Sequence, residues 1–186
     1  MTSKNRVLFT LAVAGSLLYM GCGGGATDGN GGEVPKGMMA LDLSQYGKNI
    51  IIHVPDSTAG PLSVEDMGGG LRITVGKNFQ IDLKEGAGDL NTKKDVDIKQ
   101  NEVYALDTMV VDQPDGIVYC WHMKGAAPAD STKSIYEYRF FAVVKAGDVT
   151  YEVEDVAGEI FGRKAVMSMF EAARSIKPKE AKKPEA

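Results

Sequence analysis

Apolar and polar residues alternate along two pairs of segments, and each pair is joined by a short turn. Every second residue is apolar in residues 71–75 and 79–84, which flank a turn beginning at Gly76. Residues 135–145 and 149–154 repeat the pattern. A two-residue period is typical of strands with one buried and one solvated face, and tight turns make neighbouring strands antiparallel. The chain is therefore predicted to build an antiparallel sheet.

Three further segments are predicted to be strands. Residues 49–54 alternate and are followed by a proline, whereas residues 103–111 and 117–123 flank a Gln-Pro-Asp-Gly sequence at 113–116. Proline and glycine occupy positions in that sequence that β-turns favour. The glycine-containing residues 56–70 are predicted to be loop.

The apolar spacing changes after Gly158, and the new spacing predicts a helix over residues 163–177. Pro178 ends this helix, and a shorter helix is predicted over residues 90–98. The apolar stripe of the C-terminal helix is Val166, Met169, Phe170, Ala173 and Ile176. We therefore expect an α+β fold, an antiparallel sheet of about six strands with the C-terminal helix packed on one face.

The N-terminus has the parts of an export signal. Lys4 and Arg6 precede an apolar run over residues 7–20, and Gly21 and Cys22 follow it. The run is shorter than the ~20 residues that a helix needs to cross a bilayer core, and a basic start with a small residue before the cleavage site is typical of a secretory signal. A plain secretory signal, with Cys22 left as a spare thiol, is the alternative.

Residues 17–22 (LLYMGC) resemble the lipobox of bacterial lipoproteins, in which a peptidase cleaves before a cysteine that carries diacylglycerol. The resemblance implies that residues 1–21 are a lipoprotein signal peptide and that Cys22 becomes the acylated N-terminus. Tyr19 and Met20 depart from the family pattern, which has leucine and a small residue there. Gly23 follows the cysteine in place of the aspartate that retains some lipoproteins at the inner membrane, so the family rule favours the outer membrane.

Composition divides the rest of the chain into three parts. Residues 22–44 begin with a Gly-rich stretch and are predicted to be a flexible tether, although the apolar residues near 38–41 are suited to packing on the domain edge. Residues 45–177 are predicted to form a single α+β domain. Residues 178–186 form a charged, Pro-containing tail that we expect to be disordered.

The charge of the chain argues against two classes of partner. The full chain carries a net charge of −4, and removal of the basic residues 1–21 makes the remainder more acidic still. Nucleic acids and anionic lipid surfaces favour a basic partner. We therefore expect no nucleic-acid ligand.

Cys120 and His122 are the one pair of residues that suggests catalysis. They lie two residues apart on a predicted strand, so they share a face, and a cysteine beside a histidine can act as nucleophile and base. With His53 and Met123 the same pair could suit copper or zinc. The alternative is a half-buried strand without chemistry, and no Ser-His-Asp motif accompanies either histidine.

Two other groups have simpler interpretations. Asp95 and Asp97 lack the glycine and closing glutamate of a calcium loop and lie among lysines, which indicates a solvated face. Tyr136, Tyr138 and Phe140 form an aromatic stripe that is expected to pack in the core, with a sugar- or peptide-binding surface as the alternative.

The segments GKNFQIDLK (76–84) and YRFFAVVKAGDVTYEVED (138–155), with the helix ending ARSIK (173–177), resemble bacterial envelope lipoproteins with a PsbP-like domain. The resemblance covers about residues 45–177 and implies an antiparallel sheet with packed helices in a lipoprotein context. Its motifs are structural, so it implies no active site and no photosynthetic role.

These features predict a non-enzymatic binding or accessory module of the cell envelope. The membrane is its partner through the lipid on Cys22, and an unidentified protein or small molecule is the second partner, with no cofactor or metal. A small thiol- or metal-dependent enzyme using Cys120 and His122 is the alternative, and an envelope protein without a specific ligand is a third reading.

Overall fold

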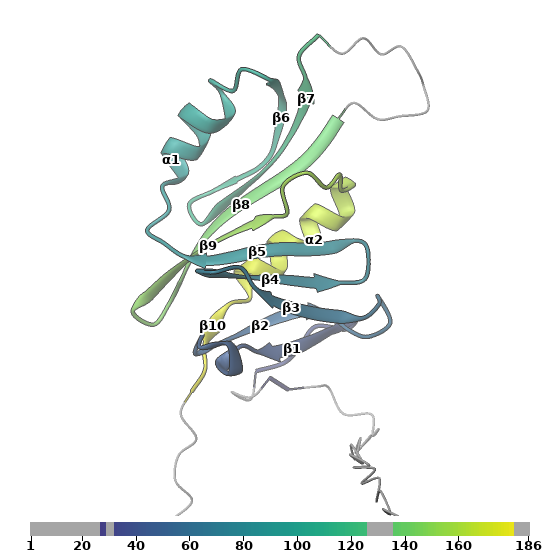
Figure 1. The fold of residues 1–186 in the computed structure, drawn as a ribbon, viewed down its shortest axis with the longest axis vertical. Helices are drawn as coiled ribbons and strands as arrows, with labels where there is room; N and C mark the ends of the chain where they lie inside the picture. The colour runs from purple at the N-terminus through teal and green to yellow at the C-terminus, as the bar shows by residue number, and fades with distance from the viewer. Residues whose placement is uncertain (1–26, 29–31, 126–135, 181–186) are drawn as a thin grey trace, which may run out of the picture.

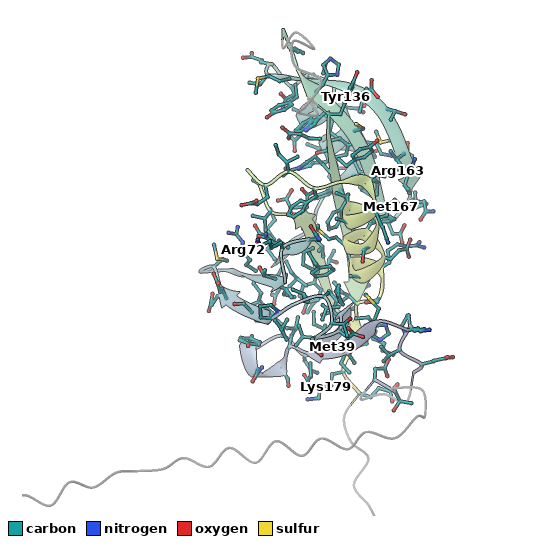
Figure 2. All side chains as sticks on the ribbon, turned by 90° about the vertical axis from the view of Figure 1, so that its right-hand side faces the viewer. Met39, Arg72, Tyr136, Arg163, Met167 and Lys179 are labelled. Carbon is teal, nitrogen blue, oxygen red and sulfur yellow. The ribbon has the colours of Figure 1, made fainter. Side chains whose placement is uncertain are left out.

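The computed structural model describes residues 27, 28, 32–125 and 136–180. Within these ranges, ten strands form two antiparallel sheets, one of seven strands in the order β3-β4-β5-β9-β8-β7-β6 and one of three in the order β1-β2-β10. In Figure 1 the three-stranded sheet lies at the lower end of the molecule, and the long strands β6, β7 and β8 extend to the upper end. Figure 2 shows the same two ends of the molecule, with Tyr136 at one end and Met39 and Lys179 at the other.

The elements follow one another in this order: β1 Met38–Asp42, η1 Ser44–Tyr46, β2 Ile50–Pro55, β3 Leu62–Asp66, β4 Gly70–Val75, β5 Phe79–Glu85, α1 Leu90–Thr92, the π-helix η2 Lys93–Ile98, β6 Tyr104–Gln113, β7 Gly116–Met123, β8 Tyr136–Ala146, β9 Val149–Asp155, α2 Arg163–Arg174 and β10 Lys177–Pro178.

The main core lies between one face of the large sheet and the layer made by α2 and β2. All five residues of the predicted helical stripe are buried, and Phe170 meets Phe140 edge to face with 6.3 Å between ring centroids. Gly116 lets α2 approach closely, because a Cβ atom there would lie 2.6 Å from Phe170 Cε2. The predicted α+β class and the packing of the C-terminal helix are confirmed.

The opposite face of the large sheet changes character from one side to the other. Over β4 and β5 it is polar, and Arg72 bonds Asp82 through Nε and Nη2, each at 2.8 Å. Over β7 and β8 it is apolar, and a second cluster of Ile117, Tyr119 and Phe141 packs against Ile98 of η2. The predicted short helix over 90–98 is thus present as α1 and η2, and it covers only part of this face.

The predicted loop over residues 56–70 is wrong in part, because it contains strand β3. This strand pairs with β4 at the edge of the large sheet, and its side chains are mostly exposed. An exposed edge strand needs no apolar alternation, so the sequence pattern did not indicate it. Gly68 and Gly69 form the tight turn into β4, with φ angles of 73° and 147°.

The boundaries of the domain also differ from the prediction. Strand β1 lies within the predicted tether of residues 22–44 and pairs with β2, because the apolar residues of this segment have a core to cover. At the other end, β10 and the backbone bond from Lys179 N to Asn49 O hold the first residues of the predicted tail. The folded domain therefore begins before residue 45 and continues past residue 177.

A buried carboxylate fixes the chain before β1. The side chain of Asp28 is fully buried and forms an ion pair with Lys177, and its Oδ2 lies 3.3 Å from His53 Nε2. Its Oδ1 accepts a hydrogen bond from Gly32 N–H at 2.8 Å. This cluster attaches residue 28 to β2 and to β10.

Cys22 and the predicted signal peptide, residues 1–21, lie outside the described residues, as do residues 181–186 of the predicted tail. Within the described ranges, no helix is both long enough and apolar enough to span a bilayer.

Candidate functional site

A cavity of about 400 Å³ opens on the sheet face opposite α2. Strands β6 and β7 contribute one wall, the loop after β9 contributes the opposite wall, and residues of η2 and β8 complete the lining. We call it the Trp121 cavity. Its lining residues are Lys93, Tyr104, Tyr119, Trp121, Glu137, Arg139, Phe140, Glu154, Asp155, Ala157, Gly158, Glu159 and Ile160.

Strand register brings the aromatic residues of one wall together. Trp121 of β7 lies opposite Leu106 of β6 and opposite Glu137 of β8. Tyr104 is two residues from Leu106 and therefore projects from the same face. Its ring stacks on Trp121 with 4.5 Å between centroids and 18° between planes. Tyr119 meets Trp121 edge to face at 5.2 Å, so three aromatic rings form one wall.

Two polar atoms of this wall define what it can bind. The Tyr104 hydroxyl donates a hydrogen bond to Glu137 Oε1 at 3.3 Å. Trp121 Nε1, in contrast, is buried and has no hydrogen-bond partner among the described residues. Because an indole N–H can only donate and a buried donor without an acceptor is costly, this atom requires an acceptor from water or from a ligand.

Arg139 fastens the loop that forms the opposite wall. One guanidinium nitrogen donates to Glu159 O at 3.0 Å and the other to Val156 O at 3.4 Å. Its Nε lies 2.8 Å from Asp155 Oδ2, and both side chains are nearly buried. The wall is therefore built into the fold.

Asp155 is the most deeply buried acidic group of the cavity, with 2% of its surface exposed. Burial raises its pKa from 3.8 to about 6, although the Arg139 charge and the backbone N–H of Phe140 oppose this shift. Oδ1 accepts the Phe140 N–H at 2.8 Å. Oδ2 accepts no hydrogen bond within the described structure, since the nearby Arg139 Nε is not aligned as a donor.

The lysine and arginine of the cavity have ion-pair partners, whereas two of its glutamates have none among the described residues. Lys93 Nζ is held 3.1 Å from Glu154 Oε2 and lies 4.9 Å from the centroid of the Phe141 ring. Both cationic lining residues, Lys93 and Arg139, therefore have carboxylate partners. Glu137 and Glu159 have no ion pair in the described structure, so the cavity carries an excess of negative charge.

Cys120 and His122 share a face of β7 as predicted, but this face is turned toward α2 and away from the cavity. Cys120 is 2% exposed, and burial, with a contribution from Asp107, raises the pKa of its thiol. A reactive cysteine needs the opposite, a lowered pKa and access to solvent. The His122 ring contacts Tyr136, and its buried Nδ1 has no partner among the described residues.

The structure does not bring the suggested metal ligands together. His53 lies on β2 in the smaller sheet, beside Asp28, whereas Cys120, His122 and Met123 lie on β7 of the larger one. The described ranges contain no group of three or more His, Cys, Asp or Glu residues arranged to hold a metal ion.

Asp95 and Asp97 form ion pairs with the lysines four residues away from each of them. Their predicted solvated face is confirmed.

The aromatic stripe on β8 is mainly core, as expected. Phe140 is buried and Tyr138 packs against the same cluster, whereas Tyr136 is 44% exposed at the strand end. The aromatic wall of the cavity lies on the opposite face and was not predicted as a site. A partial signal was available, because Tyr119 and Trp121 alternate with His122 along one strand.

No protein-family model, no curated protein and no solved structure matches this chain. The site is therefore interpreted from its own geometry, and the resemblance to PsbP-like lipoproteins stays a prediction.

Proposed function

We propose that this protein is a lipid-anchored, non-enzymatic binding module of the bacterial cell envelope, and that the Trp121 cavity holds its ligand. The buried indole N–H of Trp121 carries the proposal, because it lies in a preformed cavity and lacks an acceptor. Ligand pockets are typically concave and aromatic, with a few placed polar groups, and this cavity lies within their usual size range of roughly 300–1,000 Å³.

The chemistry of Cys120 favours binding over catalysis. A buried thiol whose pKa is raised remains protonated near neutral pH and is a weak nucleophile. The cavity itself offers aromatic rings and carboxylates. Its Tyr104 hydroxyl donates to Glu137, but burial and the Glu137 charge raise the pKa of this phenol, so it is not an activated nucleophile. Holding a small molecule is the role that these groups suit.

The proposed location in the cell envelope depends on Cys22 and on the lipobox resemblance. Acylation there would anchor the protein in the envelope, with the outer membrane favoured by Gly23. Intact-mass spectrometry of the full chain recovered from bacterial membranes tests this. We expect a product that begins at Cys22 and carries acyl chains, and a Cys22→Ser variant that is absent from the membrane fraction. A free thiol at Cys22, or a different first residue, would refute the proposed lipid anchoring.

Trp121 is the only tryptophan in the chain, so its fluorescence reports on the cavity directly. The proposal predicts that a fraction of small molecules extracted from envelopes changes this fluorescence in a saturable manner. Tyr104→Ala removes part of the aromatic wall and should abolish the change. Tyr136→Ala removes an exposed tyrosine from the opposite face and should leave it intact.

A fluorescence that no fraction alters would refute the binding proposal. So would a response of equal size in the Tyr104→Ala variant.

A further inference from the structure

Building on the proposed binding function, we infer that the Trp121 cavity selects a small organic cation that also carries a hydrogen-bond acceptor, such as an alkylammonium bearing a hydroxyl group. The inference combines the charges of the cavity, its aromatic wall and its two buried atoms without hydrogen bonds.

The charges favour a cationic ligand. Arg139 is already bound to Asp155 and to two backbone carbonyls, and Lys93 is bound to Glu154. An anionic ligand would have to displace one of these contacts, whereas Glu137 and Glu159 have no competing ion pair in the described part of the chain. A cation entering the cavity therefore meets carboxylates that it can neutralise.

The aromatic wall favours the same class. Cations are attracted to the faces of aromatic rings, most strongly to tryptophan, and aromatic cages recognise quaternary ammonium groups in this manner. Tyr104, Tyr119 and Trp121 supply three rings within one wall. The Tyr104 hydroxyl also holds Glu137 beside the rings at 3.3 Å, which places a carboxylate and the π-faces together.

The two buried atoms define the polar groups of the ligand. Asp155 Oδ2 belongs to a side chain that is 2% exposed; it forms an ion pair with Arg139 Nε at 2.8 Å but accepts no aligned hydrogen bond from the described residues. A ligand with an N–H or O–H donor would satisfy it. Trp121 Nε1 requires an acceptor. A cation with a hydroxyl group supplies a donor for Asp155 Oδ2 and an acceptor for Trp121 Nε1, and a simple metal ion or a hydrocarbon does not.

Matched probes separate charge from shape. The full chain is purified in a polyoxyethylene detergent, which contains neither sugar nor amine, and Trp121 fluorescence is titrated with choline and with 3,3-dimethyl-1-butanol, its uncharged isostere. Glucosamine and glucose form a second pair. We expect at least one cation to bind tenfold or more tightly than its neutral counterpart.

Variants test the role of the carboxylate. Glu137→Gln keeps the shape of the side chain and removes its charge, and it should weaken binding of the preferred cation about tenfold, the size expected for loss of a charge-assisted contact. Glu65→Gln removes an exposed carboxylate from the distant edge strand β3 and should have no effect. The comparison of probes on the wild-type chain needs no variant, so a misfolded Glu137→Gln protein would not prevent the test.

The outcomes distinguish this inference from the proposed function. Equal affinity for the charged and neutral members of both pairs, or no response to any of the four probes, would overturn the cation assignment. If the envelope fraction still changes Trp121 fluorescence in that case, binding survives and only the ligand class is wrong. If neither the fraction nor the probes change it, both proposals fail.

Discussion

Replacement of Asp155 by asparagine should change how the stability of the domain depends on pH. Burial raises the pKa of Asp155 from 3.8 to about 6 in the folded protein. The folded state therefore binds this proton more tightly than the unfolded state. The resulting stabilisation is fully present below about pH 3.8 and is lost as the pH rises through about 6.

The size of the effect follows from the two pKa values. Each tenfold difference in proton affinity corresponds to about 1.4 kcal/mol. The free energy of unfolding therefore falls by about 3 kcal/mol in total as the pH rises from below 3.8 to well above 6. Between about pH 4.5 and pH 7.5 the change is about 2 kcal/mol, because the unfolded state is already largely ionised at the lower limit. Asparagine has the same shape and does not titrate, and its amide oxygen can still accept the Phe140 N–H.

Urea denaturation followed by Trp121 fluorescence measures this quantity. The free energy of unfolding of the wild-type protein, relative to Asp155→Asn, should fall by about 2 kcal/mol from about pH 4.5 to pH 7.5. Asp56→Asn is the control, because hydrogen bonds from Thr58 lower the pKa of Asp56 and its contribution changes only below about pH 4. A constant difference would show that the charge of Arg139 balances burial, and a difference that grows with pH would show that it outweighs burial.

Four further substitutions test the packing and the thiol. Phe170→Ala should reduce the free energy of unfolding by about 3–5 kcal/mol, since the side chain is 1% exposed in the main core; a loss below about 1 kcal/mol in urea denaturation would contradict this packing. Gly116→Ala should cost about 1–3 kcal/mol in the same assay, because its Cβ would overlap Phe170. Cys120→Ser should leave the response of Trp121 to envelope fractions unchanged, and a thiol reagent should modify Cys120 far more slowly in the native protein than in urea; rapid native labelling would refute the buried thiol. Lys179→Ala should raise the pKa of Asp42 from about 2 toward 3.8, because Lys179 is the main cause of its lowering; an unchanged Asp42 titration by NMR would show that residue 179 does not dock.

The local pattern of apolar residues was sufficient to predict an element where that element has one buried face. The β4–β5 hairpin and α2 were predicted because their apolar residues repeat at the periods of a strand and a helix. Strand β3 has no such pattern, since its sheet partner lies on one side only and both its faces are largely exposed. Strand β1 was overlooked because its short apolar run follows a Gly-rich stretch and gains its partner, β2, only in the folded domain.

The aromatic wall of the cavity depends on the register between β6 and β7, which the sequence does not reveal. Counting back from the turn at 113–116, a regular ladder would place Trp121 opposite Thr108. Two irregularities in β6 shift the register, and Trp121 lies opposite Leu106 instead. That shift moves Tyr104 next to the indole ring. Bulges of this kind redirect side chains. No particular residue type in the sequence marks their positions, so the aromatic wall could not be predicted from alternation alone.

The buried Asp28 has a consequence for orientation. With Cys22 acylated as proposed, only six peptide units separate the lipid from Asp28, which can extend to about 20 Å at most. Asp28 is fixed to the end of the molecule that carries β1, β2 and β10, whereas Trp121 lies near the far ends of β7 and β8 (Figure 1). The end of the domain that carries β1, β2 and β10 would therefore be held close to the bilayer, and the cavity, which opens on a sheet face near the far ends of β7 and β8, would lie at a distance from the membrane where it meets solutes from the aqueous side.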